Sequence, residues 1–142
     1  MANSCGQTYG RNVFVLDISA NMAGRYCETL QLSATRIIED IPQMNYVGVV
    51  LFDGRVEIAH KLIQITDQSV RDRIIKSVPA MARGSTRIAQ GVLAGVQLLE
   101  DAKVSTEGAT LFLVTDGCDD TGEAYVNQIL PTLLSKKVLS LL

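Results

Sequence analysis

Short apolar runs alternate along this chain with longer segments in which apolar residues recur every three or four positions. Three runs, residues 13–16, 46–52 and 109–114, are rich in β-branched side chains and too short for helices. Such runs predict strands that are buried on both faces, as in a parallel sheet. A further run at residues 137–142 predicts one more strand at the end of the chain.

The segments between these runs predict helices. A first helix is predicted before Pro42, because apolar residues recur at helical spacing there: Leu30, Ala34, Ile37, Ile38 and Ile41. The Thr-Asp pair at residues 66–67 can cap a second helix, which stops at Pro79. A third helix is predicted to open at Ser85 or Thr86.

Asp53 and Gly54 join the second strand to residues 56–60, which alternate apolar and polar side chains. A two-residue Asp-Gly link between such runs is a strong hairpin signal, so we expect residues 56–60 to form an antiparallel edge strand with one solvated face. Strands that alternate with helices predict an α/β fold, a doubly wound and mainly parallel sheet with helices on both faces. We expect residues 1–142 to form one domain, and the abrupt apolar end indicates a fragment of a longer protein.

Composition narrows the range of functions. Hydrophobic residues make up 47% and charged residues 20% of the chain, typical of a globular domain. The net charge is −2 and the basic residues are scattered, which argues against nucleic-acid binding. No apolar run approaches the roughly 18 residues of a membrane span, and the first seven residues lack the apolar core of a signal peptide. Cys5, Cys27 and Cys118 have no Cys-x-x-Cys spacing, so a structural zinc site is not predicted, and their redox state stays open.

Oxygen-bearing side chains follow the buried strands. Asp17, Ser19 and Asn21 leave the first strand at alternate positions, Thr86 lies at the start of a predicted helix, and Asp116 follows a later strand. Ligands of open α/β sheets bind in the crevice outside the carboxyl ends of the strands. Two carboxylates, two hydroxyls and an amide oxygen there suit a hard divalent cation, Mg²⁺ or else Mn²⁺ or Ca²⁺.

This set of residues resembles the metal-ion-dependent adhesion site of von Willebrand factor A domains, which have a Rossmann-like fold. In that pattern Asp17 and Asp116 would bind the metal directly or through water, and Ser19 and Thr86 would be hydroxyl ligands. Asn21 departs from the pattern, because it stands where the family has a second serine. The resemblance covers nearly the whole chain and implies that a final strand and helix are missing from it.

Residues 62–65, Arg71-Asp72 and the run from Val78 to Thr86 look like the A domain of calcium-activated chloride channel regulators. The resemblance implies an extracellular or cell-surface protein and a protein-binding, adhesion-type module without enzyme activity. An acidic residue of the partner would complete the coordination of the metal. No zinc-binding His-Glu-x-x-His motif of that family's metalloprotease domain is present in the sequence.

Two alternatives stay open. Asn21 has a legitimate oxygen ligand for a hard cation, but its side chain is longer than serine and can crowd or block the site, which would leave a metal-free interaction surface. Asp17 could instead be the nucleophile of a Mg²⁺-dependent phosphatase. Such enzymes typically need a second carboxylate two residues later, and this chain has Ser19 there.

Overall fold

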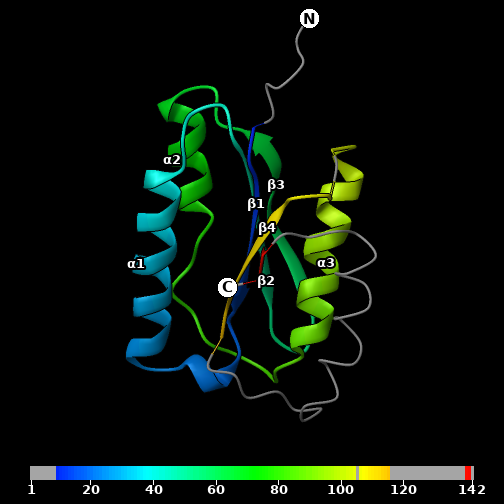
Figure 1. The fold of residues 1–142 in the computed structure, drawn as a ribbon. Helices are drawn as coiled ribbons and strands as arrows, with labels where there is room; N and C mark the ends of the chain where they lie inside the picture. Colours follow the sequence, from blue (N-terminus) through cyan, green and yellow to red (C-terminus); the bar gives the residue numbers. More distant parts are fainter. Residues whose placement is uncertain (1–8, 105, 116–139, 142) are drawn as a thin grey trace, which may run out of the picture.

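The computed structural model describes residues 9–104, 106–115 and 140–141. Within these residues the chain forms a five-stranded sheet in the order β3-β2-β1-β4-β5 (Figure 1). Its strands are β1 (Arg11–Asp17), β2 (Tyr46–Phe52), β3 (Val56–Gln64), β4 (Thr110–Val114) and β5 (Ser140–Leu141). β1 pairs in parallel with β2 and β4, and β4 in parallel with β5, whereas β3 runs antiparallel to β2. The predicted α/β sheet with one antiparallel edge strand is therefore confirmed.

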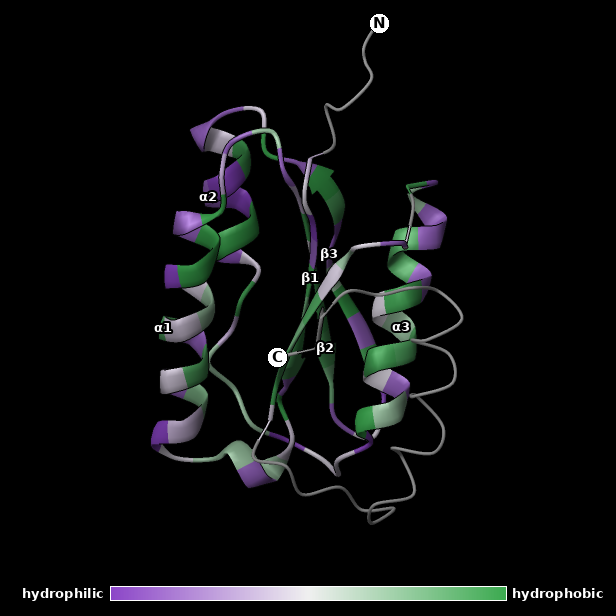
Figure 2. Cartoon of the chain, in the orientation of Figure 1, coloured by the Kyte–Doolittle hydropathy of each residue, from purple (hydrophilic) through white to green (hydrophobic). Residues whose placement is uncertain are grey.

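Helices cover both faces of the sheet. In Figure 1, α1 (Arg25–Asp40) and α2 (Gln68–Lys76) lie on one side, and α3 (Ile88–Asp101) lies on the other. Alternate residues of β1 face the two layers: Phe14 and Leu16 pack with α1 and α2, and Val13 and Val15 pack with α3. Figure 2 shows the hydrophobic central strands and the mixed surfaces of α1 and α2. β1 is thus buried on both faces, as its apolar run predicts.

Two glycines allow α3 to approach the sheet closely. A Cβ atom added to Gly91 would lie 2.6 Å from a ring carbon of Phe52, and one added to Gly95 would lie 3.0 Å from a methyl group of Val15. A larger residue at Gly91 would force the helix or the ring to move. This close contact fixes the start of α3 against β2 and so positions the segment that contains Thr86.

Several element boundaries differ from the predictions. α3 begins at Ile88, so neither Ser85 nor Thr86 opens it, and Arg87 is the N-cap without a capping side chain. The backbone N–H of Arg87 instead donates to the carbonyl of Asp53 at 3.1 Å, a contact between distant segments that local capping rules do not contain. α2 ends at Lys76, before Pro79, whereas its predicted N-cap is confirmed at Asp67, which accepts from the N–H of Val70 at 3.1 Å.

The hairpin is confirmed with two corrections. Three residues, 53–55, separate β2 from β3, and the N–H of Asp53 donates to the carbonyl of Arg55 at 3.0 Å. β3 also continues past His60 to Gln64, and its register against β2 shifts on both sides of Val49. Such irregularities interrupt the alternation of apolar and polar side chains, so the strand predicted from that alternation ends too early, at His60.

Some predictions need qualification. Ile37, predicted on the apolar side of the first helix, is 36% exposed. Of the predicted final strand, the structure describes Ser140 and Leu141, and the rest lies outside the described residues.

Cys27 has a free thiol, while Cys5 and Cys118 lie outside the described residues. Among the helices described, none has the length and apolar character to cross a membrane.

Candidate functional site

Asp17, the last residue of β1, is fully buried at the carboxyl edge of the sheet. Its Oδ1 accepts the backbone N–H of Ser19 at 2.8 Å, and its Oδ2 accepts the hydroxyl of Thr115 at 2.6 Å. The first bond closes a tight turn in which a carboxylate accepts from the backbone two residues on. Thr115 follows β4, so Asp17 joins the ends of two parallel strands. Thr115 directly precedes the predicted ligand Asp116, but its hydrogen bond to Asp17 is not part of the predicted site.

The segment before α3 lies against the loop that leaves β1. The N–H of Arg83 donates to the carbonyl of Ile18 at 2.6 Å, and the N–H of Ala20 donates to the carbonyl of Gly84 at 3.0 Å. Further along, Nδ2 of Asn21 donates to the hydroxyl of Thr86 at 3.4 Å, and Thr86 is 1% exposed. The structure thus brings two segments about 65 residues apart to the same edge of the sheet.

The buried hydroxyl of Ser19 distinguishes the turn after β1 from an ordinary turn. Ser19 is fully buried, and its Oγ has no hydrogen-bond partner in the part of the chain that the structure describes. A buried polar atom left in this way costs about 1–3 kcal/mol. A cation beside Asp17 would satisfy this oxygen and leave the existing bonds of Asp17 intact, since each carboxylate oxygen has a second lone pair.

The other predicted ligands fit a hard cation to different degrees. Thr86 provides a buried hydroxyl. Asn21 turns its Nδ2 toward Thr86, so its amide has to rotate before Oδ1 can bind a cation there. Asp116 lies outside the described residues. Within residues 9–104, 106–115 and 140–141, no three His, Cys, Asp or Glu side chains form a metal-binding group, so a cation here depends on hydroxyl and amide oxygens besides Asp17.

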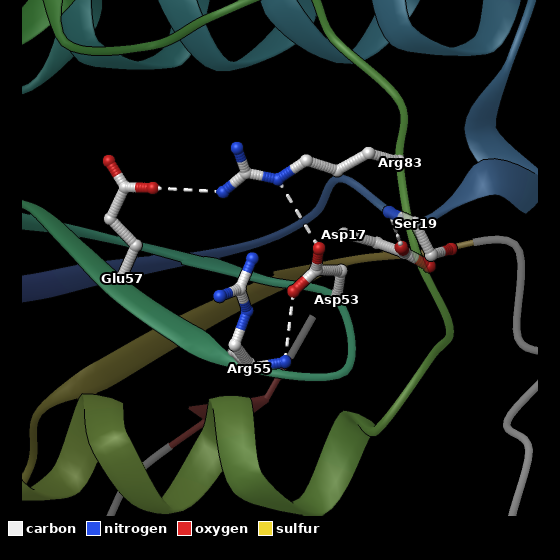
Figure 3. Close-up of polar contacts among 6 residues, drawn as sticks. All are labelled: Asp17, Ser19, Asp53, Arg55, Glu57 and Arg83. Carbon is white, nitrogen blue, oxygen red and sulfur yellow. Dashed lines mark hydrogen bonds and ion pairs between the residues drawn. The ribbon is translucent and has the colours of Figure 1, made fainter.

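An ion pair between an exposed arginine and a buried carboxylate lies beside these two segments (Figure 3). The side chain of Asp53 is 7% exposed, and its Oδ2 is 3.3 Å from Nε of Arg83. Its Oδ1 accepts the N–H of Arg55 at 2.9 Å. Nη2 of Arg83 also lies 3.1 Å from the carboxylate of Glu57. Asp53 therefore fastens the β2–β3 link to the segment that leads to Thr86.

The sequence alone does not predict this ion pair, because Asp53 fits a hairpin link and Arg83 is one of the scattered basic residues. The two residues lie 30 positions apart, and no local motif connects them. The sequence does contain one signal, the glycine at position 84. In the structure Gly84 has φ +71°, and a Cβ atom there would lie 2.7 Å from Oδ2 of Asp53. A glycine next to Arg83 thus marks the point where the two segments touch.

The position of Asp17 argues against the phosphatase alternative. A carboxylate nucleophile must reach the phosphorus atom of a substrate with an oxygen atom. Asp17 is 0% exposed, and each of its oxygens already accepts a hydrogen bond from Ser19 or Thr115. These contacts suit a fixed structural or ligating carboxylate.

The sequence matches a known domain family over most of its length. A sequence model described as "von Willebrand factor type A domain" matches residues 12–118. The chain belongs to the von Willebrand factor type A (VWA) family. The match starts within β1 and includes Asp17 at the end of that strand as well as the loops of Ser19 and Thr86, so the candidate site lies inside the VWA domain.

The predicted similarity to chloride channel regulators is confirmed. Calcium-activated chloride channel regulator 1 of Bos taurus is 33% identical over 117 residues, which are 81% of this chain and 13% of the relative. Inter-alpha-trypsin inhibitor heavy chain H3 of Mesocricetus auratus is 31% identical over 125 residues, 82% of this chain and 14% of the relative. The chain therefore spans about one seventh of the length of these relatives.

Solved structures show the same fold. A von Willebrand factor type A protein from Catenulispora acidiphila superposes with a TM-score of 0.81 and 15% identity, over 94% of this chain and 32% of that one. The pilus adhesin SpaC from Lactobacillus rhamnosus GG, in its open conformation, gives a TM-score of 0.64 and 19% identity, over 80% of this chain and 15% of that one. At these identities the similarity establishes the fold.

Proposed function

We propose that this VWA domain binds a protein partner at the carboxyl edge of its sheet through a divalent cation. The buried hydroxyl of Ser19, which lacks a hydrogen-bond partner among the described residues and lies beside the fixed carboxylate of Asp17, supports this proposal most strongly. The cation is Mg²⁺, with Mn²⁺ or Ca²⁺ as alternatives, and its ligands are Asp17, Ser19, Asn21, Thr86 and Asp116. When bound, it offers an open position to a carboxylate oxygen of the partner.

The proposed ligands supply either negative charge or neutral oxygens. Asp17 supplies negative charge at a fixed position, because Ser19 and Thr115 hold both of its oxygens. The hydroxyls of Ser19 and Thr86 supply neutral oxygens, which leave the cation electron-poor enough to attract an acidic partner. Asp116 supplies the second carboxylate.

The relatives define the biological setting that we propose. The chain is similar over 81% of its length to a calcium-activated chloride channel regulator, and it shares the fold of one part, 15% of the chain, of a pilus adhesin. We therefore propose an adhesion-type interaction module in a secreted or cell-surface protein of the chloride channel regulator type. The module has no enzymatic role in this proposal.

A metal-free interaction surface is the second candidate. The observation that favours it is the direction of the Asn21 amide, whose donor end faces the Thr86 hydroxyl at 3.4 Å. With its nitrogen in that position, the Asn21 amide offers no oxygen to a cation beside the Thr86 hydroxyl. The same edge of the sheet would then bind a partner through hydrogen bonds and packing alone.

Calorimetric titration of Mg²⁺, Mn²⁺ and Ca²⁺ into the purified domain separates the two candidates. Asp17→Asn keeps the size of the side chain and removes its charge, and Asp40→Asn makes the same change at an exposed residue of α1. We expect saturable binding to the wild type and to Asp40→Asn, and none to Asp17→Asn. A wild-type domain that binds none of the three cations would refute the metal site and favour the metal-free surface.

A further inference from the structure

A small pocket opens beside the loop that follows Asp17. Its volume is about 270 Å³, and it lies between the β2–β3 link and the segment of Arg83. Ile18 and Leu51, both almost fully buried, form its apolar floor, and charged side chains surround it. Small-molecule sites usually measure roughly 300–1,000 Å³, so this pocket suits one side chain of a protein partner better than a cofactor.

The charged groups of this pocket have spare hydrogen-bond donors. Both oxygens of Asp53 are engaged, by Nε of Arg83 and by the N–H of Arg55. Arg83 uses Nε and Nη2 and keeps Nη1. The guanidinium of Arg55, with its five N–H donors, forms no hydrogen bond or ion pair within the described residues, and because the residue is exposed these donors face solvent. Figure 3 shows both arginine side chains extending toward the space between Asp53 and Glu57.

Glu57 provides the main opposing charge, but its effect is limited. Its carboxylate is already paired with Nη2 of Arg83 at 3.1 Å, and its side chain is 57% exposed. Solvent therefore screens much of its remaining field. The Arg83 side chain is 47% exposed and Arg55 is exposed, so an anionic ligand would replace water at the donors that Asp53 and Glu57 leave open and would form charge-assisted hydrogen bonds with them.

We propose that this pocket receives a glutamate side chain of the partner protein, as a second anchor next to the metal site. The methylene groups would lie on Ile18 and Leu51, and the carboxylate would pair with Arg55 and the free Nη1 of Arg83. The inference rests on the proposed function, since both sites lie on the same edge of the sheet. It adds a property of the partner: an acidic surface with two carboxylates, one for the cation and one for the arginines.

The test uses the peptide acetyl-Gly-Glu-Gly-amide and its glutamine counterpart, titrated at constant ionic strength in buffer stripped of divalent cations. Arginine Nε–Hε signals and backbone amides are followed by NMR. We expect saturable shifts at Arg55, Arg83 and Ile18 with the glutamate peptide and none with the glutamine peptide. Arg55→Gln should weaken the binding about two- to fivefold, and Glu57→Gln should strengthen it. Lys61→Gln, the same charge change further along β3, should leave it unchanged.

Equal affinities of the wild type and Arg55→Gln would overturn the proposal, as would equal binding of the two peptides. Arg55 keeps its backbone bond to Asp53 in this variant, so loss of folding does not obscure the result. Because no divalent cation is present, the experiment examines the pocket independently of the metal site. Metal binding without peptide binding would refute the pocket alone, and the reverse result would refute the metal-dependent function alone.

Discussion

Gly84→Ala tests how strongly the contact with Asp53 determines the position of the Thr86 segment. Gly84 has φ +71°, where a residue with a Cβ atom loses about 1–2 kcal/mol. The added methyl group would also lie 2.7 Å from Oδ2 of Asp53, closer than real Cβ atoms approach other atoms. Overpacking of this kind costs about 1–3 kcal/mol. We therefore expect the free energy of unfolding to fall by about 2–5 kcal/mol.

Gly108→Ala is the matched control. Gly108 also has a positive φ, +77°, but a Cβ atom there would make only an ordinary contact, 3.4 Å from the flexible end of Arg11. This variant should lose only the backbone part, about 1–2 kcal/mol. Equilibrium unfolding in urea measures both losses. In an Asp53→Ala background the difference between the two glycine variants should shrink, since the carboxylate is gone.

The reasoning fails if Gly84→Ala and Gly108→Ala lose the same stability in the wild-type background. Such a result would mean that the segment before α3 moves freely away from Asp53. It would also remove the structural reason to expect Asp53 to influence Thr86.

Three further predictions follow from single contacts. Arg83→Ala should lower the free energy of unfolding in urea by about 1–2 kcal/mol, because it leaves the buried Asp53 carboxylate without its guanidinium partner. Arg83→Lys should recover part of the loss. Hydrogen bonds from Ser69 and the N–H of Val70 lower the pKa of Asp67 below its usual 3.8, so its stabilisation is complete above that pH and disappears as the pH falls through the lowered value. The difference in Tm between wild type and Asp67→Ala should therefore shrink on acidification. Asn21→Ser should raise the Mg²⁺ affinity in calorimetry, and an unchanged affinity would show that Asn21 is already a competent ligand.

The sheet was predictable because its strands have short-range signatures. The apolar run of β1, the Asp-Gly link at residues 53–54 and the alternation that follows it each lie within a few residues. The position of Thr86 beside the loop of Ser19 was also within reach, since a helix that leads into a parallel strand starts at the edge of the sheet where the strands end. These inferences need only the local pattern and general rules of topology.

The missed features all depend on contacts between distant segments. The pairing of Asp53 with Arg83 joins residues 30 positions apart, and the hydroxyl of Thr115 reaches Asp17 across 98 positions. The start of α3 is set by the bond from Arg87 to the carbonyl of Asp53. The length of β3 depends on register shifts against β2, which interrupt its alternating pattern. Periodicity carries no signal for any of these contacts.

The central claim is that a divalent cation binds between the loop of Ser19 and the segment of Thr86. Paramagnetic broadening by Mn²⁺ tests this location directly, because the effect falls off steeply with distance from the ion. The account predicts that the backbone amide signals of Ser19 and Thr86 broaden together at low Mn²⁺, that excess Mg²⁺ restores them, and that Asp17→Asn shows neither effect. No broadening, or broadening confined to the acidic end of α3 at Glu100 and Asp101, would contradict it.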